Sequence, residues 1–566
     1  MRSLLLFAAP LVLLTACASA GPTRTGEVAA ELQDTGYSPY GLYLAGEAAL
    51  SDGRSEEAAR YFDLARGDPE AAPLLGERAF QAALLAGDVQ KAALLVPTGD
   101  DASEAAKRLG ALVVAVEAMA EGKGKAAQTQ LASPEIGFPH KSAAALLAPW
   151  AAAMAGDVEG SLVLPQVKGD ALVDYFGQIG RAQLFERARR FDEAETEFKA
   201  VTAGERPSIV SLIAYGAFLE RRGRRADALA LYDKGLAADP SSAELLAARA
   251  RAAAGKGAPA MPSLKAGAAQ ALLGPAVSMM TARQGQLGLA YLRLALRLDP
   301  TRDDAWILTG DALQSSGDTA GAREAYAKPK PGSPQYATGQ AKLAWTYQQE
   351  NEPETAIRIA RAAASSGGPE ARLTLADLLR ANERYPEAAV LLTGLIDEAK
   401  TPDWRLLYAR AVVYERMGRW PDAQKDLETA LQVEPDEPEL LNFLGYSWID
   451  RGERLPEALK MVEKAVAQNP RSGAMIDSLG WAHFKLGDYK KAVEKLEQAA
   501  ELEAGDPEIN NHLGDAYWKI GRRDEAVYQW RRVLTLNPDE KIRAEVEGKL
   551  ASGAGPGAKP ARIAGQ

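Results

Sequence analysis

Small and large apolar residues recur toward the end of the chain with a period of about 34 residues. Four small residues, each in the middle of an apolar stretch, are separated by 34, 35 and 34 positions: Ala411, Gly445, Gly480 and Gly514. A second set of small residues follows in step: Ala423, Ala458, Ala492 and Ala526. A unit of this length forms one helical hairpin, which cannot bury its apolar face alone and stacks on its neighbours. The pattern therefore predicts an all-α solenoid of helix-turn-helix units.

Larger apolar residues keep the same register around the small ones. In the last unit, Leu513, Tyr517 and Trp530 accompany Gly514 and Ala526. This arrangement resembles the tetratricopeptide repeat (TPR), in which these residues take positions 7, 11, 24, 8 and 20. The resemblance implies that the small residues meet where the two helices of a hairpin cross, and that the large residues fill the space around this contact.

Glycine and proline mark the expected ends of these helices. One glycine in each unit is predicted to end the first helix in a left-handed turn: Gly418, Gly452, Gly487 and Gly521. Three units have a proline behind the second helix, which cannot continue through it: Pro435, Pro470 and Pro538.

Weaker copies of the template continue upstream and give about a dozen units between residues 38 and 540. We expect a degenerate N-terminal array at residues 38–254 and a C-terminal array at residues 276–550. Residues 255–275 are rich in glycine, proline and alanine, which predicts a loop or distorted unit and the place of a hinge. Residues 328–334 are predicted to be an extended turn between repeats, and residues 551–566 a disordered tail.

The first residues combine one charge, a short apolar stretch and a cysteine. Arg2 precedes Leu4–Leu14, which is too short to span a bilayer, and Cys17 is the only cysteine of the chain. This segment resembles the signal peptide and lipobox of bacterial lipoproteins. The resemblance implies removal of residues 1–16, acylation of Cys17, a flexible tether at residues 17–37, and an outer-membrane lipoprotein that faces the periplasm. The alternative is ordinary cleavage after Ala20, which would leave a secreted or periplasmic soluble protein.

The rest of the sequence carries no recognisable catalytic motif. Its three histidines are far apart, and no metal-binding, phosphate-binding, dinucleotide-binding or hydrolase spacing is present. A formal charge of −10 argues against binding to nucleic acid. We therefore predict a protein that is not an enzyme, that needs no cofactor, metal or small-molecule substrate, and that binds other proteins.

The expected binding surface follows from the TPR resemblance, because positions 5, 9 and 12 of the first helices face inward in this family. An amide at position 5 suits the backbone of an extended peptide, and aromatic residues at positions 9 and 12 have the composition of binding hot spots. The alternative is that the aromatic residues only pack between units. The predicted protein-binding residues are Tyr408, Asn442, Tyr446, Asp477, Trp481, Asn511, Asp515 and Trp518.

The chain from Ser38 to Trp518 also resembles a family of proteobacterial TPR lipoproteins, most clearly at Leu441–Ser447 and Asp477–Trp481. That family is similar to the outer-membrane TPR lipoprotein adaptor of a carboxyl-terminal processing protease. The resemblance implies a scaffold in the cell envelope that presents client proteins to a partner such as a periplasmic protease. The alternative function is a pilot lipoprotein that supports assembly of a secretin, a pilus or a polysaccharide export complex.

Overall fold

The computed structural model describes residues 38–66, 75–99, 102–204, 207–366, 368–399 and 401–552. Within these ranges the regular structure consists of thirty helices, α2 to α31, without a strand. The predicted signal peptide (1–16), the tether (17–37) with Cys17, and the tail beyond Ser552 lie outside the described residues. The chain forms two compact units, unit 1 at residues 1–350 and unit 2 at residues 351–566.

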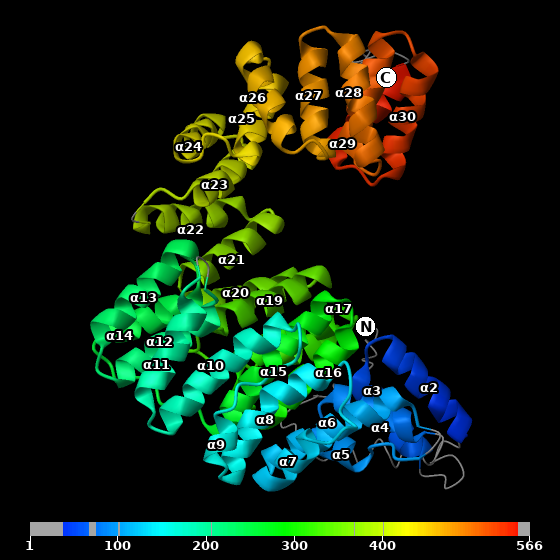
Figure 1. Ribbon diagram of the computed structural model, residues 1–566. Coiled ribbons are helices and arrows are strands. Elements are labelled where there is room, and N and C mark those ends of the chain that lie inside the picture. The colour runs from blue at the N-terminus through cyan, green and yellow to red at the C-terminus, as the bar shows by residue number, and fades with distance from the viewer. Residues whose placement is uncertain are drawn as a thin grey trace, which may run out of the picture. The chain divides into compact units, whose positions relative to one another are not determined.

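The described part of unit 1 contains eight helical hairpins and two single helices (Figure 1). Its hairpins are α2 (Pro39–Ser51) with α3 (Ser55–Ala65), α4 (Gly76–Ala86) with α5 (Val89–Leu94), α6 (Glu104–Ala120) with α7 (Gly124–Leu131), α8 (Lys141–Ala155) with α9 (Val158–Ser161), α10 (Ala171–Arg187) with α11 (Phe191–Thr202), α12 (Ile209–Arg221) with α13 (Arg225–Ala238), α15 (Leu264–Thr281) with α16 (Gly285–Leu298), and α17 (Asp303–Ser315) with α18 (Thr319–Tyr326). The single helices are α14 (Ala243–Ala253) and α19 (Tyr336–Gln349).

Unit 2 begins with α20 (Pro353–Ser366) and ends with α31 (Glu540–Ser552). Between them are five hairpins: α21 (Pro369–Ala381) with α22 (Tyr385–Glu398), α23 (Trp404–Arg416) with α24 (Trp420–Val433), α25 (Pro438–Arg451) with α26 (Leu455–Gln468), α27 (Gly473–Lys485) with α28 (Tyr489–Leu502), and α29 (Pro507–Lys519) with α30 (Arg523–Thr535). The predicted stack of helical hairpins is confirmed in both units.

A close helix crossing holds each regular hairpin together. A Cβ added at Gly514 would lie 2.6 Å from Cδ1 of Trp530, and a Cβ at Gly310 would lie 2.3 Å from Cε1 of Tyr326. Real side chains do not approach this closely, so only glycine lets the ring of the second helix lie flat against the first helix. Trp530 is fully buried by this contact. The small residues of positions 8 and 20 were predicted to meet at the crossing, and a Cβ at Gly514 would indeed lie 3.3 Å from the backbone oxygen of Ala526, but the large residue of position 24 is the closer contact.

The predicted helix ends are also confirmed. The four glycines expected to end first helices have φ between 72° and 85°, which is the left-handed region. The second helices α24, α26 and α30 end before Pro435, Pro470 and Pro538. Residues 327–335 contain no helix, as expected for the turn predicted at residues 328–334.

The predicted break at residues 255–275 was wrong from Leu264 onward, because α15 begins there. The glycines that suggested a loop are instead positions of close approach: a Cβ at Gly267 would lie 2.1 Å from Cη2 of Trp150, and a Cβ at Gly274 would lie 2.8 Å from Cε2 of Phe176. Only the part before Leu264 is a loop. The division of the chain into compact units falls after Glu350 and not at the predicted hinge.

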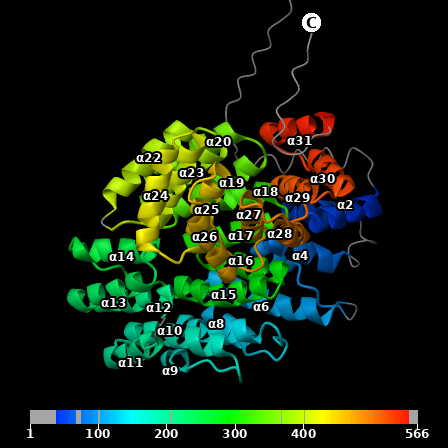
Figure 2. The same cartoon turned by 90° about the horizontal axis from the view of Figure 1, so that it is seen from above.

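The hairpin of α15 and α16 fills the interior of unit 1. α15 packs on α8 and α10, and α16 packs on α4 and α6, so this hairpin contacts the first helices of four earlier repeats (Figure 2). Polar contacts fix it in place. Arg297 forms two hydrogen bonds to Glu117 at 2.7 and 2.8 Å, Arg293 Nε donates to the carbonyl oxygen of Leu85 at 2.9 Å, and the Tyr291 hydroxyl lies 2.8 Å from Nδ1 of His140.

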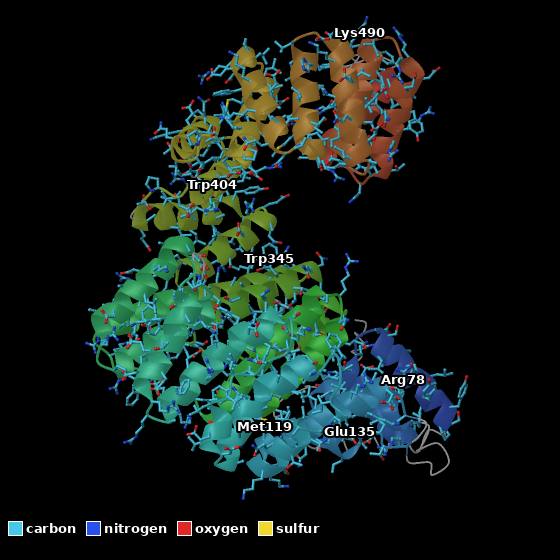
Figure 3. All side chains as sticks on the ribbon, in the orientation of Figure 1. Arg78, Met119, Glu135, Trp345, Trp404 and Lys490 are labelled. Atoms are coloured by element: carbon cyan, nitrogen blue, oxygen red, sulfur yellow. The ribbon has the colours of Figure 1, made fainter. Side chains whose placement is uncertain are left out.

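Charged side chains cover the outer surfaces of the helices. Lys490 of α28 projects into solvent, whereas Met119 of α6 is fully buried in the core of unit 1 (Figure 3). Among the described helices, none combines the length and the apolar character that crossing a membrane would require.

We predict that Gly514→Ala destabilises unit 2 by roughly 1–3 kcal/mol, because the added methyl group overpacks the contact with the buried Trp530 ring. Gly394→Ala in α22 is the matched control, since a Cβ there meets no atom within 4 Å. The control should be more stable than the parent by about 0.5–1 kcal/mol. Urea unfolding of the full chain, followed by circular dichroism, measures both. Equal stability of Gly514→Ala and the parent would contradict the role given to the crossing.

Candidate protein-binding site

Two neighbouring pockets lie on the first-helix face of unit 2. The larger has a volume of about 380 Å³ and is lined by residues of α23, α25, α27, α29 and α31. The smaller has a volume of about 170 Å³ and is lined by residues of α25, α27 and α29. Phe443, Tyr446 and Glu508 line both pockets, which therefore adjoin each other.

The structure brings five of the predicted binding residues to these pockets. Tyr446, Trp481 and Asn511 line the larger pocket, and Asn442 and Asp477 line the smaller pocket together with Tyr446. They come from successive first helices, so the TPR register places them side by side.

Three other predicted residues do not line either pocket. Tyr408 packs edge-on against Phe443 with 5.6 Å between ring centroids, and Trp518 packs against Trp530 at 5.4 Å. Asp515 is only 2% exposed and binds Lys549 at 2.7 Å and the indole nitrogen of Trp530 at 3.1 Å. The expectation that Asp515 contacts a client was therefore wrong, because its carboxylate is inside the protein and fully used there.

Two rings of an aromatic stack, Trp481 and His512, line the larger pocket. Trp481 lies between Phe484 and His512, with ring centroids 4.5 Å and 4.0 Å away and nearly parallel planes. The buried carboxylate of Asp477 holds His512 through Nδ1 at 2.9 Å. Burial by itself lowers the pKa of His512, but the charge and hydrogen bond of Asp477 outweigh it and the net pKa is raised. The stack fixes the orientation of Trp481.

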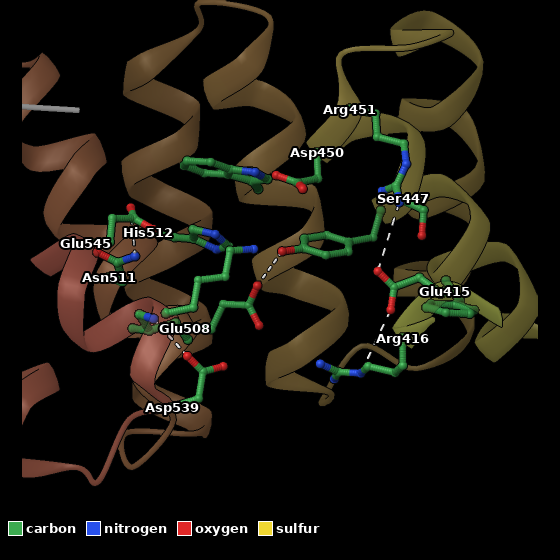
Figure 4. Close-up of a pocket in the computed structure, with 15 residues that line it drawn as sticks. Glu415, Arg416, Ser447, Asp450, Arg451, Glu508, Asn511, His512, Asp539 and Glu545 are labelled. Carbon is green, nitrogen blue, oxygen red and sulfur yellow. Dashed lines mark hydrogen bonds and ion pairs between the residues drawn. The ribbon is translucent and has the colours of Figure 1, made fainter. Parts of the chain in front are cut away.

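A tyrosine–carboxylate contact forms the floor that the two pockets share. The hydroxyl of Tyr446 donates a hydrogen bond to Glu508, and burial together with this carboxylate raises the pKa of Tyr446. Figure 4 shows Glu415, Arg416 and Arg451 on one side of the pocket and Glu508 and Glu545 on the other. The site therefore has aromatic residues at its bottom and charged residues along both edges.

Two polar atoms at this site have no partner within the described residues. They are the side-chain oxygen of Asn442 and the indole nitrogen of Trp481, and both are buried. An unpaired buried acceptor or donor costs roughly 1–3 kcal/mol. A ligand that supplies one N–H and one carbonyl group removes this cost when the two side chains turn toward the pockets that they line.

The last helix, α31, closes one end of the site, and the repeat pattern does not predict it as an element of its own. Lys549 of α31 binds Asp515, donates to Asn511 Oδ1 at 2.9 Å and contacts Glu545 at 2.6 Å. Two signals were available in the sequence. Asp539 caps the helix through the Ile542 amide at 2.7 Å, and apolar residues recur every four positions at Ile542, Val546 and Leu550.

Within the described ranges, no group of three or more His, Cys, Asp and Glu side chains could hold a metal ion. His140 is far from the site in sequence and belongs to the core of unit 1, where burial lowers its pKa to about 4. The chemistry that the pocket offers is recognition through hydrogen bonds and aromatic contact.

Stacked helical hairpins with an open first-helix face define an α-helical repeat protein of the kind that binds other proteins. Comparison with known families agrees: two models described as tetratricopeptide repeat match residues 263–538 and 209–252. The chain is therefore a TPR protein, as predicted. Proteins of this family are typically non-enzymatic protein-binding scaffolds.

Individual relatives are distant. The TPR repeat-containing protein PA4667 of Pseudomonas aeruginosa is 26% identical over 216 residues, which are 38% of this chain and 36% of that protein. The chain thus matches about a third of the length of this relative. Among solved structures, one chain of the APC/C hetero-tetramer Cut9–Hcn1 is 16% identical to this chain. The match covers 93% of this chain and 98% of that chain, with a TM-score of 0.38. The thermophilic TPR protein TTC0263 of Thermus thermophilus is 27% identical and covers 32% of this chain and 100% of its own, with a TM-score of 0.29.

We predict that His512 makes the stability of unit 2 depend on pH. A histidine whose pKa is raised by folding contributes its full stability below its unfolded pKa of about 6.5 and loses it as pH rises through the folded value. The stability lost in His512→Gln should therefore be largest at about pH 6 and smaller at about pH 9. Urea unfolding of the full chain at both pH values measures it.

His483→Gln provides the control for this pH dependence. Burial lowers the pKa of His483, so this residue should contribute with the opposite sign and lose stability as pH falls. A difference between His512→Gln and the parent that does not change with pH would refute the pairing of His512 with Asp477.

Proposed function

We propose that unit 2 binds extended segments of client proteins along its first-helix face, and that the chain is a non-enzymatic scaffold. The observation that carries this proposal is the pair of adjoining pockets at Asn442, Tyr446 and Trp481, with an unpaired acceptor on Asn442 and an unpaired donor on Trp481. An extended peptide offers an N–H group and a carbonyl group on every residue except proline, which has no N–H. It can therefore satisfy both atoms, as a compact apolar ligand cannot.

The aromatic residues of the site support the same function. Trp481 is held by the stack with Phe484 and His512, and Tyr446 is held by its hydrogen bond to Glu508. Because these rings are already fixed, a client loses little binding free energy to ordering them. Rigid Trp and Tyr side chains at the centre of an interface are typical binding hot spots.

The size of the site sets the kind of client. Cavities of about 380 Å³ and 170 Å³ hold a few side chains and not a folded domain. We infer that clients insert a short extended segment, such as a chain terminus or an unfolded loop.

We further propose that the scaffold works in the cell envelope, anchored by acyl chains on Cys17, and presents its clients to a partner such as a periplasmic protease. This part rests on the sequence, where the apolar stretch Leu4–Leu14 precedes the only cysteine of the chain, and on the resemblance to proteobacterial TPR lipoproteins.

We predict that the double variant Asn442→Leu with Trp481→Phe lowers client capture by about tenfold. Asn442→Leu keeps the branched shape of the side chain, and Trp481→Phe keeps an aromatic ring in the stack, although a smaller one. Each substitution removes one hydrogen-bonding group worth about 0.5–1.5 kcal/mol. Affinity capture from detergent-solubilised envelopes with quantitative mass spectrometry compares this variant with the parent. Gln498→Leu on the exposed side of α28 is the control. Clients retained in equal amounts by the double variant would show that this face is not the binding site.

We predict that Cys17→Ser abolishes incorporation of labelled palmitate and shifts the protein from the membrane fraction to the soluble fraction, because a single acyl chain or none does not hold a protein on a membrane stably. Labelling and fractionation of cells that express either form measure the two effects. A Cys17→Ser protein that stays in the membrane fraction would point to another anchor.

A further inference from the structure

Three neighbouring segments of unit 1 carry an excess of positive charge. They are residues 186–193 around the α10–α11 turn, residues 220–227 around the α12–α13 turn, and residues 251–263 at the end of α14 and behind it (Figure 1). Together they contain nine Arg and Lys residues and five Asp and Glu residues, whereas the whole chain has a formal charge of −10. We call these three segments the basic edge, because their local charge is opposite in sign to that of the protein.

Direct contacts hold the three segments of the basic edge together. The Arg222 guanidinium lies over the Phe191 ring, 3.8 Å from the ring centroid, and so joins the two hairpin turns. Arg225 and Arg187, one from each turn, donate hydrogen bonds to backbone carbonyl oxygens of residues 251–263, the first at 3.4 Å. The third segment therefore lies against both turns, and the charges of all three act on one patch of surface.

Five cations of the basic edge have no carboxylate partner among the described residues, and all five are exposed: Arg187, Arg189, Arg222, Arg225 and Lys256. The other four cations form ion pairs: Arg190 with Glu193, Arg221 with Glu186, Arg224 with Asp227, and Arg251 with Glu220. Arg224 also binds Glu195 of α11, which is shared with Lys199. A hydrogen bond to a neutral carbonyl oxygen leaves the charge of a guanidinium in place, so an excess of four positive charges faces solvent here.

Three of these unpaired arginines are held in place with most of their donors available. Arg187 and Arg225 each use one terminal nitrogen for the bond to the third segment. Arg222 lies on Phe191 and has no hydrogen bond to a described residue. A guanidinium has five N–H donors in one plane, so each of the three can still bind a phosphate group through two of them.

Beside these cations the chain exposes a segment without charge. Residues 257–262 have the sequence Gly-Ala-Pro-Ala-Met-Pro and contain no helix, and Ala258 and Ala260 are exposed. Cations around an uncharged, largely apolar loop match the surface of an anionic lipid bilayer, where phosphate groups lie above acyl chains. An acidic polypeptide would pair with the cations but would gain nothing from the loop.

We propose that the basic edge is a docking surface for an anionic lipid membrane. Its exposed arginines bind lipid phosphate groups, and residues 257–262 enter the headgroup region. The basic edge belongs to unit 1, so this role goes beyond the function proposed for unit 2 and does not depend on it. Salt screens a contact of this kind, so it adds to an acyl anchor and does not replace one.

The test uses residues 17–566 with Cys17→Ser, which keep every described helix and carry no acyl chain. Co-sedimentation compares vesicles of phosphatidylcholine alone with vesicles that contain about one third phosphatidylglycerol. The parent should bind the anionic vesicles at about 50 mM NaCl, and at least about tenfold more weakly at about 500 mM. Binding to phosphatidylcholine alone should also be at least about tenfold weaker, because the cations then meet no net negative charge.

Arg189→Gln with Arg222→Gln removes two of the unpaired charges, and neither side chain has a hydrogen bond or ion pair to a described residue. This variant should bind anionic vesicles about ten- to thirtyfold more weakly, because each cation near an anionic membrane contributes about fivefold. Lys425→Gln with Lys490→Gln is the matched control. It makes the same change in net charge at two exposed lysines of unit 2 and should leave binding unchanged.

A fluorescent label separates a membrane from an acidic polypeptide. Cys17 is the only cysteine of the chain, so Ala260→Cys in the Cys17→Ser background takes a single nitrobenzoxadiazole label. Its fluorescence should rise at least about twofold with anionic vesicles, because the label enters an apolar environment, and should not change with polyglutamate. The same label at Ala504→Cys, in an exposed turn of unit 2, should respond to neither.

Three outcomes would overturn the proposal. The first is equal binding of the parent and the Arg189→Gln, Arg222→Gln variant to anionic vesicles. The second is a label at residue 260 that does not respond to vesicles, a result that does not depend on how the arginine variant folds. The third is an equal response of this label to polyglutamate, which would assign the basic edge to an acidic polypeptide instead.

Discussion

Each regular hairpin of this protein depends on one contact, the close approach of a small residue in the first helix to a large residue in the second. At Gly216 a Cβ would lie 2.2 Å from Tyr232, and at Gly480 it would lie 2.6 Å from Leu496. The large residue is fully buried in both hairpins. Because this contact uses one face of the first helix, the opposite face needs no packing inside the hairpin. That free face is where the two units differ.

In unit 2 the free face stays open and carries polar and aromatic residues. Asn442, Tyr446 and Trp481 line pockets there, and the only described helix that closes the site is α31 at its end. In unit 1 the hairpin of α15 and α16 covers the corresponding faces of α4, α6, α8 and α10. The N-terminal repeats are therefore alanine-rich and irregular because both sides of their first helices belong to a core, as at Ala143 and Trp150.

The sequence predicted what depends on local spacing and missed what depends on contacts between distant residues. The period, the turn glycines and the alignment of Tyr446 with Trp481 follow from positions within a repeat, so they could be read from one chain. The role of Gly267 could not be predicted in this way, because glycine is common both in loops and where two helices approach closely. Its partner Trp150 is 117 positions earlier in the chain. The prediction that Asp515 contacts a client was wrong for a related reason, because its partner Lys549 lies in a helix outside the repeat pattern.

The contrast between the units also explains why a cavity remains beside α12 in unit 1. The α15–α16 hairpin covers the first helices up to α10, and the chain then reaches it from α14 through an extended segment instead of a helix. A helix at residues 255–263 would satisfy its own carbonyl groups, whereas the prolines leave them for Arg221 and Arg187. The same feature that lets the chain turn back into its own interior thus leaves Ile213 partly uncovered beside a cavity. In both units, therefore, a cavity lies where a first helix of the repeat is not fully covered by the chain's own helices.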